Sequence, residues 1–229
     1  MSREFKIWKD PYDTGFSLYK KSSITLQPGL TVLVGCNGIG KTTLLNCIKD
    51  SLQSKEVPVI TFNNLQDGGS KAISKAGFYG DMEFMATAIC SSEGENIIMN
   101  IGNLAKDIGV FVTKNIGKKE IWILLDAVDS GLSIDNVIDV KNYLFKTIID
   151  DTKSKGIDAY IIVSANEYEM ANGENCLDVY NCKHVTLSNY DDYKKLILDS
   201  AEWKRKRENI KKKRAKRSDI SNDISQRSK

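Results

Sequence analysis

The sequence predicts an α/β fold with a mostly parallel central sheet flanked by helices, and three observations support this class. An apolar strand near residue 30 runs directly into a glycine-rich loop and then into a helix. Further apolar segments typical of buried strands follow at residues 57–62, 120–126 and 159–163. Ahead of the loop, turn residues separate short segments that predict an N-terminal antiparallel β region, namely 5–8, 16–19 and 23–26.

The glycine-rich loop carries the pattern of a phosphate-binding loop. Gly35, Gly40, Lys41 and Thr42 follow the strand with the spacing G-x-x-x-x-G-K-[ST]. Glycines let backbone N–H groups close around phosphate oxygens, and Lys41 brings a positive charge to the β- and γ-phosphates. Thr42 offers a hydroxyl to Mg²⁺, and the helix that begins there directs its positive end at the anion. The strand before the loop and the helix over 41–52 favour this interpretation over a glycine-rich turn without a ligand.

Two later segments extend the predicted site. Ser92 and Glu95 fit a capping box at the start of an amphipathic helix, which by itself explains these residues. The segment EIWILLD at 120–126 is a very apolar strand that ends in Asp126. A carboxylate at the carboxyl edge of a parallel sheet is placed to hold Mg²⁺ with its waters.

These motifs, in this order, resemble those of the ABC-type ATPases, and more closely the heads of the SMC, RecF and related DNA-repair ATPases. Their phosphate loop commonly reads GxNGxGK[ST], against GCNGIGKTT at 35–43 here. Their signature motif reads LSGGQ or LSSGE, against SSEGE at 91–95, and their Walker B segment reads like LLDEPTSGLD, against LLDAVDSGLS at 124–133. The resemblance spans about residues 5–192 and implies a P-loop NTPase of ABC type with ATP and Mg²⁺ as cofactors.

The resemblance also implies a composite site shared by two copies of the chain, and therefore an ATP-dependent homodimer. One copy would bind the nucleotide through its phosphate loop, namely Gly35, Asn37, Gly38, Gly40, Lys41, Thr42 and Thr43. The second copy would contact the same γ-phosphate through the helix start that contains Ser92, Gly94 and Glu95. The Mg²⁺ ligands would be Thr42, Asp126 and Gln66.

Some positions in this scheme stay open between alternatives. Gln66 lies where ABC ATPases have a glutamine that contacts Mg²⁺ and water; Asn63 and Asn64 are rival candidates, and a solvated turn is the other interpretation. An aromatic residue beside the adenine is common in the N-terminal region of that class. Tyr12 and Tyr19 are candidates for this stacking, although a tyrosine in a strand is more often a packing residue.

The chain departs from the family pattern at the catalytic base. The residue after the Walker B aspartate is normally a glutamate that polarises the attacking water, and here it is Ala127. A methyl group neither accepts a proton nor orients water, so the pattern predicts MgATP binding with slow hydrolysis at best. Either the natural protein lacks the glutamate, or the chain carries a Glu→Ala substitution that traps the ATP-bound dimer. The otherwise intact motifs favour the substitution.

The second departure is at the switch histidine that normally follows the next strand. Ala165 or Asn166 occupies that place; Asn166 can donate a hydrogen bond to a phosphate but cannot shuttle a proton. The sole histidine of the sequence, His184, lies further on in NCKHVTL, where we expect a structural residue in a strand.

Spacing and composition exclude several classes of protein. Only 51 positions separate Lys41 from Ser92, which leaves a reduced helical subdomain and little surface for a transporter's membrane partner. Sustained heptads of a long coiled coil are lacking. The sequence has no apolar run of membrane-spanning length and no signal peptide at its start, so we expect a cytoplasmic protein without membrane contact, with its five cysteines reduced.

The charge distribution divides the chain into an ATPase head, 1–203, and a basic C-terminal helix and tail, 204–229, expected to be partly disordered. The tail has 12 Lys and Arg against 3 Asp and Glu, while the head has 21 against 27. Such a density of cations attracts a polyanion, with DNA the first candidate, an acidic partner protein the second and an anionic membrane the last. The tail lacks the apolar face of a membrane-lying helix.

The sequence thus predicts an ATP-binding ABC-type ATPase that dimerises around MgATP. It would act as a nucleotide-gated switch in DNA transactions such as repair, or the replication of or defence against a mobile element or phage. The alternatives are a switch that regulates a partner protein and, less favoured, the nucleotide-binding subunit of a transporter.

Overall fold

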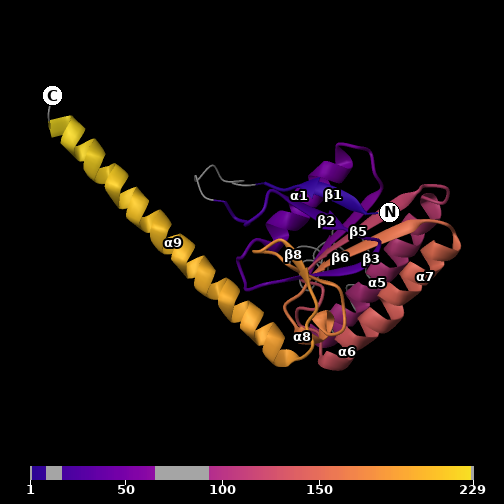
Figure 1. The fold of residues 1–229 in the computed structure, drawn as a ribbon. Helices are drawn as coiled ribbons and strands as arrows, with labels where there is room; N and C mark the ends of the chain where they lie inside the picture. The colour runs from indigo at the N-terminus through magenta and orange to yellow at the C-terminus, as the bar shows by residue number, and fades with distance from the viewer. Residues whose placement is uncertain (1, 9–16, 65–92, 228–229) are drawn as a thin grey trace.

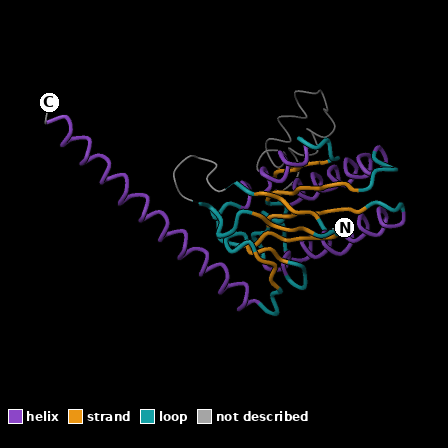
Figure 2. Tube along the Cα trace, turned by 45° about the horizontal axis from the view of Figure 1, so that its top comes forward, coloured by secondary structure: helices purple, strands orange, loops and turns teal. Residues whose placement is uncertain are grey.

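The computed structural model describes residues 2–8, 17–64 and 93–227. Within these ranges the central sheet has six strands, five of them mutually parallel, with β8 antiparallel at one edge. The strands of the sheet are orange in Figure 2, with helices beside them in purple. In spatial order the strands are β4 (Val59–Asn63), β5 (Glu120–Asp126), β6 (Asp158–Ser164), β3 (Gly29–Val34), β7 (Cys176–Asp178) and β8 (Lys183–Val185). This order confirms the expected mostly parallel sheet.

Helices cover both faces of the sheet (Figure 1). One face carries α1 (Lys41–Gln53) and a small antiparallel sheet of β1 (Arg3–Lys6) and β2 (Ser23–Leu26). The other face carries α5 and a continuous helical run in which a π-helical segment, η1, joins two α-helices. The bounds of these elements are Glu93–Lys114 for α5, Ile134–Asp139 for α6, Val140–Phe145 for η1 and Lys146–Ser154 for α7.

The apolar strand β5 shows how the sequence builds both cores. Alternate residues of a strand point to opposite faces of its sheet. Ile121, Ile123 and Leu125 belong to the core under α5 and the α6–α7 run, whereas Trp122 and Leu124 belong to the core under α1. Because both faces are covered, the strand is apolar at every position between Glu120 and its terminal aspartate.

The N-terminal region confirms one expected strand and corrects two. The strand expected at 23–26 is β2, which pairs with β1. The strand expected at 5–8 lies slightly earlier, at Arg3–Lys6. In the strand expected at 16–19, residues 18 and 19 form bends instead and residue 17 has no regular structure. Leu18 and Tyr19 are consecutive and both buried, which the alternation of a strand on a half-covered sheet does not allow.

The helix α9 (Tyr190–Arg227) continues without a break across the expected boundary between 203 and 204. Its first turns pack on the body of the protein, and its C-terminal part extends far beyond the sheet (Figure 1). The expected division into head and tail stays a prediction. None of the helices in the described part of the chain is both long and apolar enough to cross a bilayer.

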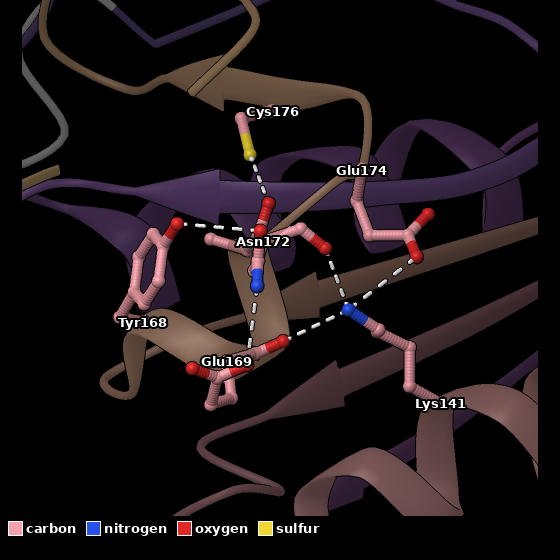
Figure 3. Close-up of polar contacts among 7 residues, drawn as sticks. Lys141, Tyr168, Glu169, Asn172, Glu174 and Cys176 are labelled. Atoms are coloured by element: carbon pink, nitrogen blue, oxygen red, sulfur yellow. Dashed lines mark hydrogen bonds and ion pairs between the residues drawn. The ribbon is translucent and has the colours of Figure 1, made fainter. Parts of the chain in front are cut away.

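A half-buried lysine holds the short helix α8 (Tyr168–Ala171), which follows the loop after β6. Lys141, in η1, donates hydrogen bonds from Nζ to the carbonyl oxygens of Glu169 and Asn172, at 2.9 and 2.6 Å. It also pairs with the Glu174 carboxylate at 3.6 Å (Figure 3). These carbonyls lie at the C-terminal end of α8, where helical partners are lacking. Lys141 therefore fixes the chain immediately beyond the loop at 165–167.

We expect Lys141→Ala to lower the free energy of unfolding by about 2 kcal/mol, because two partly buried carbonyls and a carboxylate lose their donor. Lys146→Ala, which removes an exposed lysine from the same helical run, should change it by less than about 0.5 kcal/mol. Urea unfolding followed by circular dichroism measures both. Equal changes in the free energy of unfolding for the two variants would contradict this role of Lys141.

Candidate nucleotide-binding site

The phosphate loop follows β3 and ends where α1 begins, at Lys41. Two of its glycines illustrate why the backbone needs this residue. Gly38 has φ +73° and Gly40 has φ +117°, conformations that residues with a Cβ rarely adopt. A Cβ at Gly40 would also lie 3.2 Å from the hydroxyl oxygen of Tyr19, whose O–H donates to the Gly40 carbonyl at 2.9 Å. Tyr19 thus supports the loop from within the core.

Lys41 lies folded over this loop. Its Nζ donates a hydrogen bond to the carbonyl oxygen of Gly35 at 2.8 Å, and the residue is only 9% exposed. Burial lowers the pKa of Lys41, and the nearby charges of Asp129, Cys36 and Asp126 act in the opposite direction. An anion bound in the loop would stabilise the buried ammonium group further, as the phosphate-loop interpretation requires.

The carboxylate of Asp126 receives three side-chain hydrogen bonds. Thr42 Oγ1 donates to Oδ2 at 2.8 Å and Asn63 Nδ2 donates to the same oxygen at 3.0 Å. Ser164 Oγ donates to Oδ1 at 2.5 Å. The structure therefore brings together the hydroxyl of Thr42 and the carboxylate of Asp126, two of the three predicted Mg²⁺ ligands. Mg²⁺ is typically held by one or two such ligands together with waters and phosphate oxygens, so these residues fit the metal.

Sequence reasoning missed Ser164. Its hydroxyl, besides donating to Asp126, accepts a hydrogen bond from the backbone N–H of Ala127 at 2.8 Å. One sequence pattern could have predicted Ser164 as a site residue: a polar residue at the carboxyl end of a buried strand, the pattern that identified Asp126. Ala127 itself has φ +54°, in the left-handed region, and its position is fixed by this bond.

Asp129 is a second residue that sequence reasoning did not select. It is fully buried, and its Oδ2 accepts hydrogen bonds from the backbone N–H groups of Asn166 and Glu167 at 2.7 and 2.8 Å. Burial raises the pKa of Asp129, while these two N–H groups act to lower it. Asn166 also donates from Nδ2 to Ser130 Oγ at 2.8 Å. The segment after Walker B thereby holds the loop after β6.

These groups surround a cavity of about 380 Å³, within the range of small-molecule sites. Its lining includes three cations, Lys41, Arg207 and Lys211, against the carboxylate of Asp126. The other lining residues are Leu18, Asn37, Gly38, Gly40, Thr42, Thr43, Ala127, Ser164 and Asn166. The excess of positive charge and the N-terminus of α1 fit the phosphates of a nucleotide. Asn37, Gly38 and Thr43 were predicted to bind them.

Comparison with known proteins agrees with this geometry. A family model described as an AAA domain matches residues 14–229. The chain belongs to this AAA domain family. The DNA replication and repair protein RecF of Arthrobacter sp. (strain FB24) is 57% identical over 35 residues, which are 15% of this chain and 9% of that relative. The chain therefore spans a small part of the relative's length. Fold, motifs and family identify an ABC-type P-loop ATPase similar to the SMC and RecF proteins.

The structure of this AAA domain protein shows where several of the alternative residues lie. Asn63 contacts Asp126, so one rival of Gln66 lies at the site; Asn64 instead donates to the Ser130 carbonyl at 2.9 Å. Tyr19 is 2% exposed, which leaves its ring no open face for an adenine, so its role is packing. His184 lies in β8, as expected of a structural residue, and its Nε2 is 2.7 Å from the Thr25 carbonyl oxygen.

Several predicted residues of this ATPase lie outside the described part of the chain. These are Tyr12, Gln66 and Ser92. Within the described residues, α5 runs from Glu93, and the backbone of Gly94 and Glu95 is helical. Their contact with a nucleotide on a second copy stays a prediction.

Proposed function

We propose that this chain binds MgATP, dimerises around it and acts as a nucleotide-gated switch in DNA transactions. The observation that carries the proposal is the cavity in which Lys41, Thr42 and Asp126 meet below the N-terminus of α1. Lys41 and the loop's N–H groups would hold the phosphates, and Thr42 and Asp126 would hold Mg²⁺. The bound metal would balance charge on the phosphates, while the chain's own residues orient the nucleotide.

We further propose that hydrolysis is slow, because no proton acceptor occupies position 127. The backbone N–H of Ala127 is hydrogen-bonded to Ser164 beside Asp126, so a side chain at this position lies on the lining of the cavity. A methyl group there leaves an attacking water without a base. The consequence is capture of the nucleotide rather than rapid turnover.

Ala127→Glu should raise the rate of ATP hydrolysis by about 10²-fold or more, the usual contribution of a positioned base. Ala127→Gln is the matched control, since it has nearly the same size but accepts no proton, and it should stay slow. Phosphate release at saturating MgATP measures both. A rate for Ala127→Glu no higher than that of the parent, with or without DNA, would contradict this role of position 127.

The dimer is proposed from the family resemblance and from the position of α5. In the related heads, the signature helix start of one copy completes the phosphate site of the other. The same surface patches meet across such a two-fold interface, so one kind of chain is sufficient. Slow hydrolysis would prolong the life of this complex.

MgATP should convert the protein from monomer to dimer, with a sedimentation coefficient that increases with protein concentration. The interface would form only when phosphates join the two copies. Lys41→Ala, which removes the loop's cation, should stay monomeric at the same nucleotide concentration. Analytical ultracentrifugation with no nucleotide, ADP or ATP, each with and without duplex DNA, tests this. A monomer under every condition would exclude the proposed dimer.

A DNA partner is proposed from charge and from the position of the basic helix. The sequence from residue 213 on is basic. The backbone of residues 213–227 follows the part of α9 that lies on the body and extends away from it (Figure 1). A basic helix directed outward suits the contacts with phosphates that dominate DNA affinity. The RecF relative is named for DNA replication and repair, which supports the same choice of partner.

Neutralising four of these cations in the full-length chain should weaken DNA binding and flatten its salt dependence, by about 0.9 in the slope of log K against log[salt] for each lost phosphate contact. The substitutions are Lys213→Gln, Arg214→Gln, Lys216→Gln and Arg217→Gln. The matched control neutralises four exposed lysines on the body, namely Lys55, Lys118, Lys119 and Lys153. Fluorescence anisotropy with labelled DNA measures the slopes, and equal slopes for both variants would refute the assignment.

A switch acting on a partner protein is the second candidate. Leu198 and Ile210 on α9 are 57% and 47% exposed, and exposed apolar side chains on a helix can meet an apolar groove. A chain that dimerises with MgATP but shows no salt-dependent DNA binding would favour this candidate.

A further inference from the structure

The basic helix α9 lies directly against the phosphate loop. Ser200 Oγ accepts a hydrogen bond from the backbone N–H of Cys36 at 2.9 Å, in a buried position. One turn later, Lys204 Nζ donates to the carbonyl oxygen of Asn37 at 3.0 Å. A Cβ on Gly38 would lie 2.7 Å from the same Nζ. The helix thus contacts three consecutive residues of the loop that would hold the phosphates.

Arg207, about one turn beyond Lys204, lines the nucleotide cavity together with Lys41. Its guanidinium carbon lies 5.0 Å from the centre of the Trp203 ring, which holds the group in place. Trp203 in turn packs on Tyr180, with ring centres 3.9 Å apart. The side chain of Arg207 is therefore held in position by packing on the body of the protein.

Two donors of this guanidinium are buried without an acceptor. Nε and Nη1 of Arg207 are inaccessible to water and have no hydrogen-bond partner among the residues that the structure describes. Buried donors without partners are costly, and a buried charge more so. Asp126, the carboxylate of the same cavity, already accepts three hydrogen bonds from other side chains. An anionic ligand in the cavity would supply the missing acceptor.

We propose that Arg207 binds the phosphates of the nucleotide, so that α9 forms one wall of the nucleotide site and the basic helix is held in place by the bound nucleotide. A guanidinium suits this role because its planar set of donors matches phosphate oxygens in pairs. Lys204, Arg207 and Lys211 are spaced three and four residues apart and share one face of the helix. Lys211 lines the same cavity.

This inference rests on the proposed binding of ATP, and it adds a link between that site and the basic segment beyond it. Energetic coupling between two sites is reciprocal. If the nucleotide fixes α9 through Arg207, a polyanion bound to the outer part of the same helix changes the affinity for nucleotide by the same factor. The helix is then the element that connects the two proposed ligands.

Arg207→Ala in the full-length chain should weaken binding of MgATP and MgADP by about ten- to a hundredfold, as expected for loss of a charge-assisted hydrogen bond. Arg205→Ala is the matched control, because it removes the same charge from an exposed position two residues away on another face of α9. Its effect should stay within about twofold, the change expected of a screened surface charge. Arg207→Lys keeps the charge but not the planar donors, so its affinity for nucleotide should lie between those of Arg207→Ala and Arg205→Ala. Equilibrium titration with a fluorescent ATP analogue measures all of them.

A second readout separates phosphate binding from mere packing on Trp203. In the parent protein, ATP should slow trypsin cleavage after residues 204–206, sites that the variant keeps, and Arg207→Ala should lose this protection at nucleotide concentrations that saturate the variant. Thermal unfolding without nucleotide shows whether the variant is folded. If Arg207→Ala keeps the parent's affinity while Lys41→Ala loses it, the role of Arg207 is refuted and ATP binding stands. If the parent protein binds no ATP, the proposed function itself fails.

Discussion

The carboxylate of Asp126 is the interaction on which the rest of the site depends. The parallel register sets Asn63 beside Asp126 and Asp126 beside Ser164, so three strand ends meet at one level of the sheet. Asn63 and Ser164 donate to the carboxylate from the two neighbouring strands, and Thr42 donates to it from the first turn of α1. Three donors stabilise a charge that is only 9% exposed. The same bonds join the strand ends to the helix that carries the phosphate loop.

This arrangement also fixes the residue after Asp126. Ser164 bonds both the carboxylate of Asp126 and the N–H of Ala127, so the chain turns at a set point and Ala127 adopts φ +54°. A left-handed conformation costs a residue with a Cβ about 1 kcal/mol. The bonds around Asp126 and the burial of Val128 offset that cost. The surrounding contacts therefore fix the backbone at position 127. The side chain at this position can be exchanged without altering that backbone.

Local patterns were enough to predict the phosphate loop, the helix α1 and the strands β3 and β5, because spacing and alternation along the chain determine them. Ser164 and Asn63 were harder to assign, since their roles depend on which strands are neighbours, and sheet order is a property of the whole fold. Tyr19 illustrates the same limit. A tyrosine near the nucleotide suggested stacking, but only the packing beneath the loop shows its O–H bonded to the Gly40 carbonyl.

The basic segment shows how composition and structure divide a chain differently. The net charge of the sequence changes sharply near residue 204. The helix α9 continues across this point because Lys, Arg and Glu all favour helix. Contacts from Ser200 and Lys204 to the loop lie on both sides of the change. The helix α9 therefore has two parts: one contributes Arg207 and Lys211 to the lining of a cavity, and the backbone further along extends beyond the body (Figure 1). A rigid helix transmits displacement along its length, so the position of its outer part depends on what occupies the cavity.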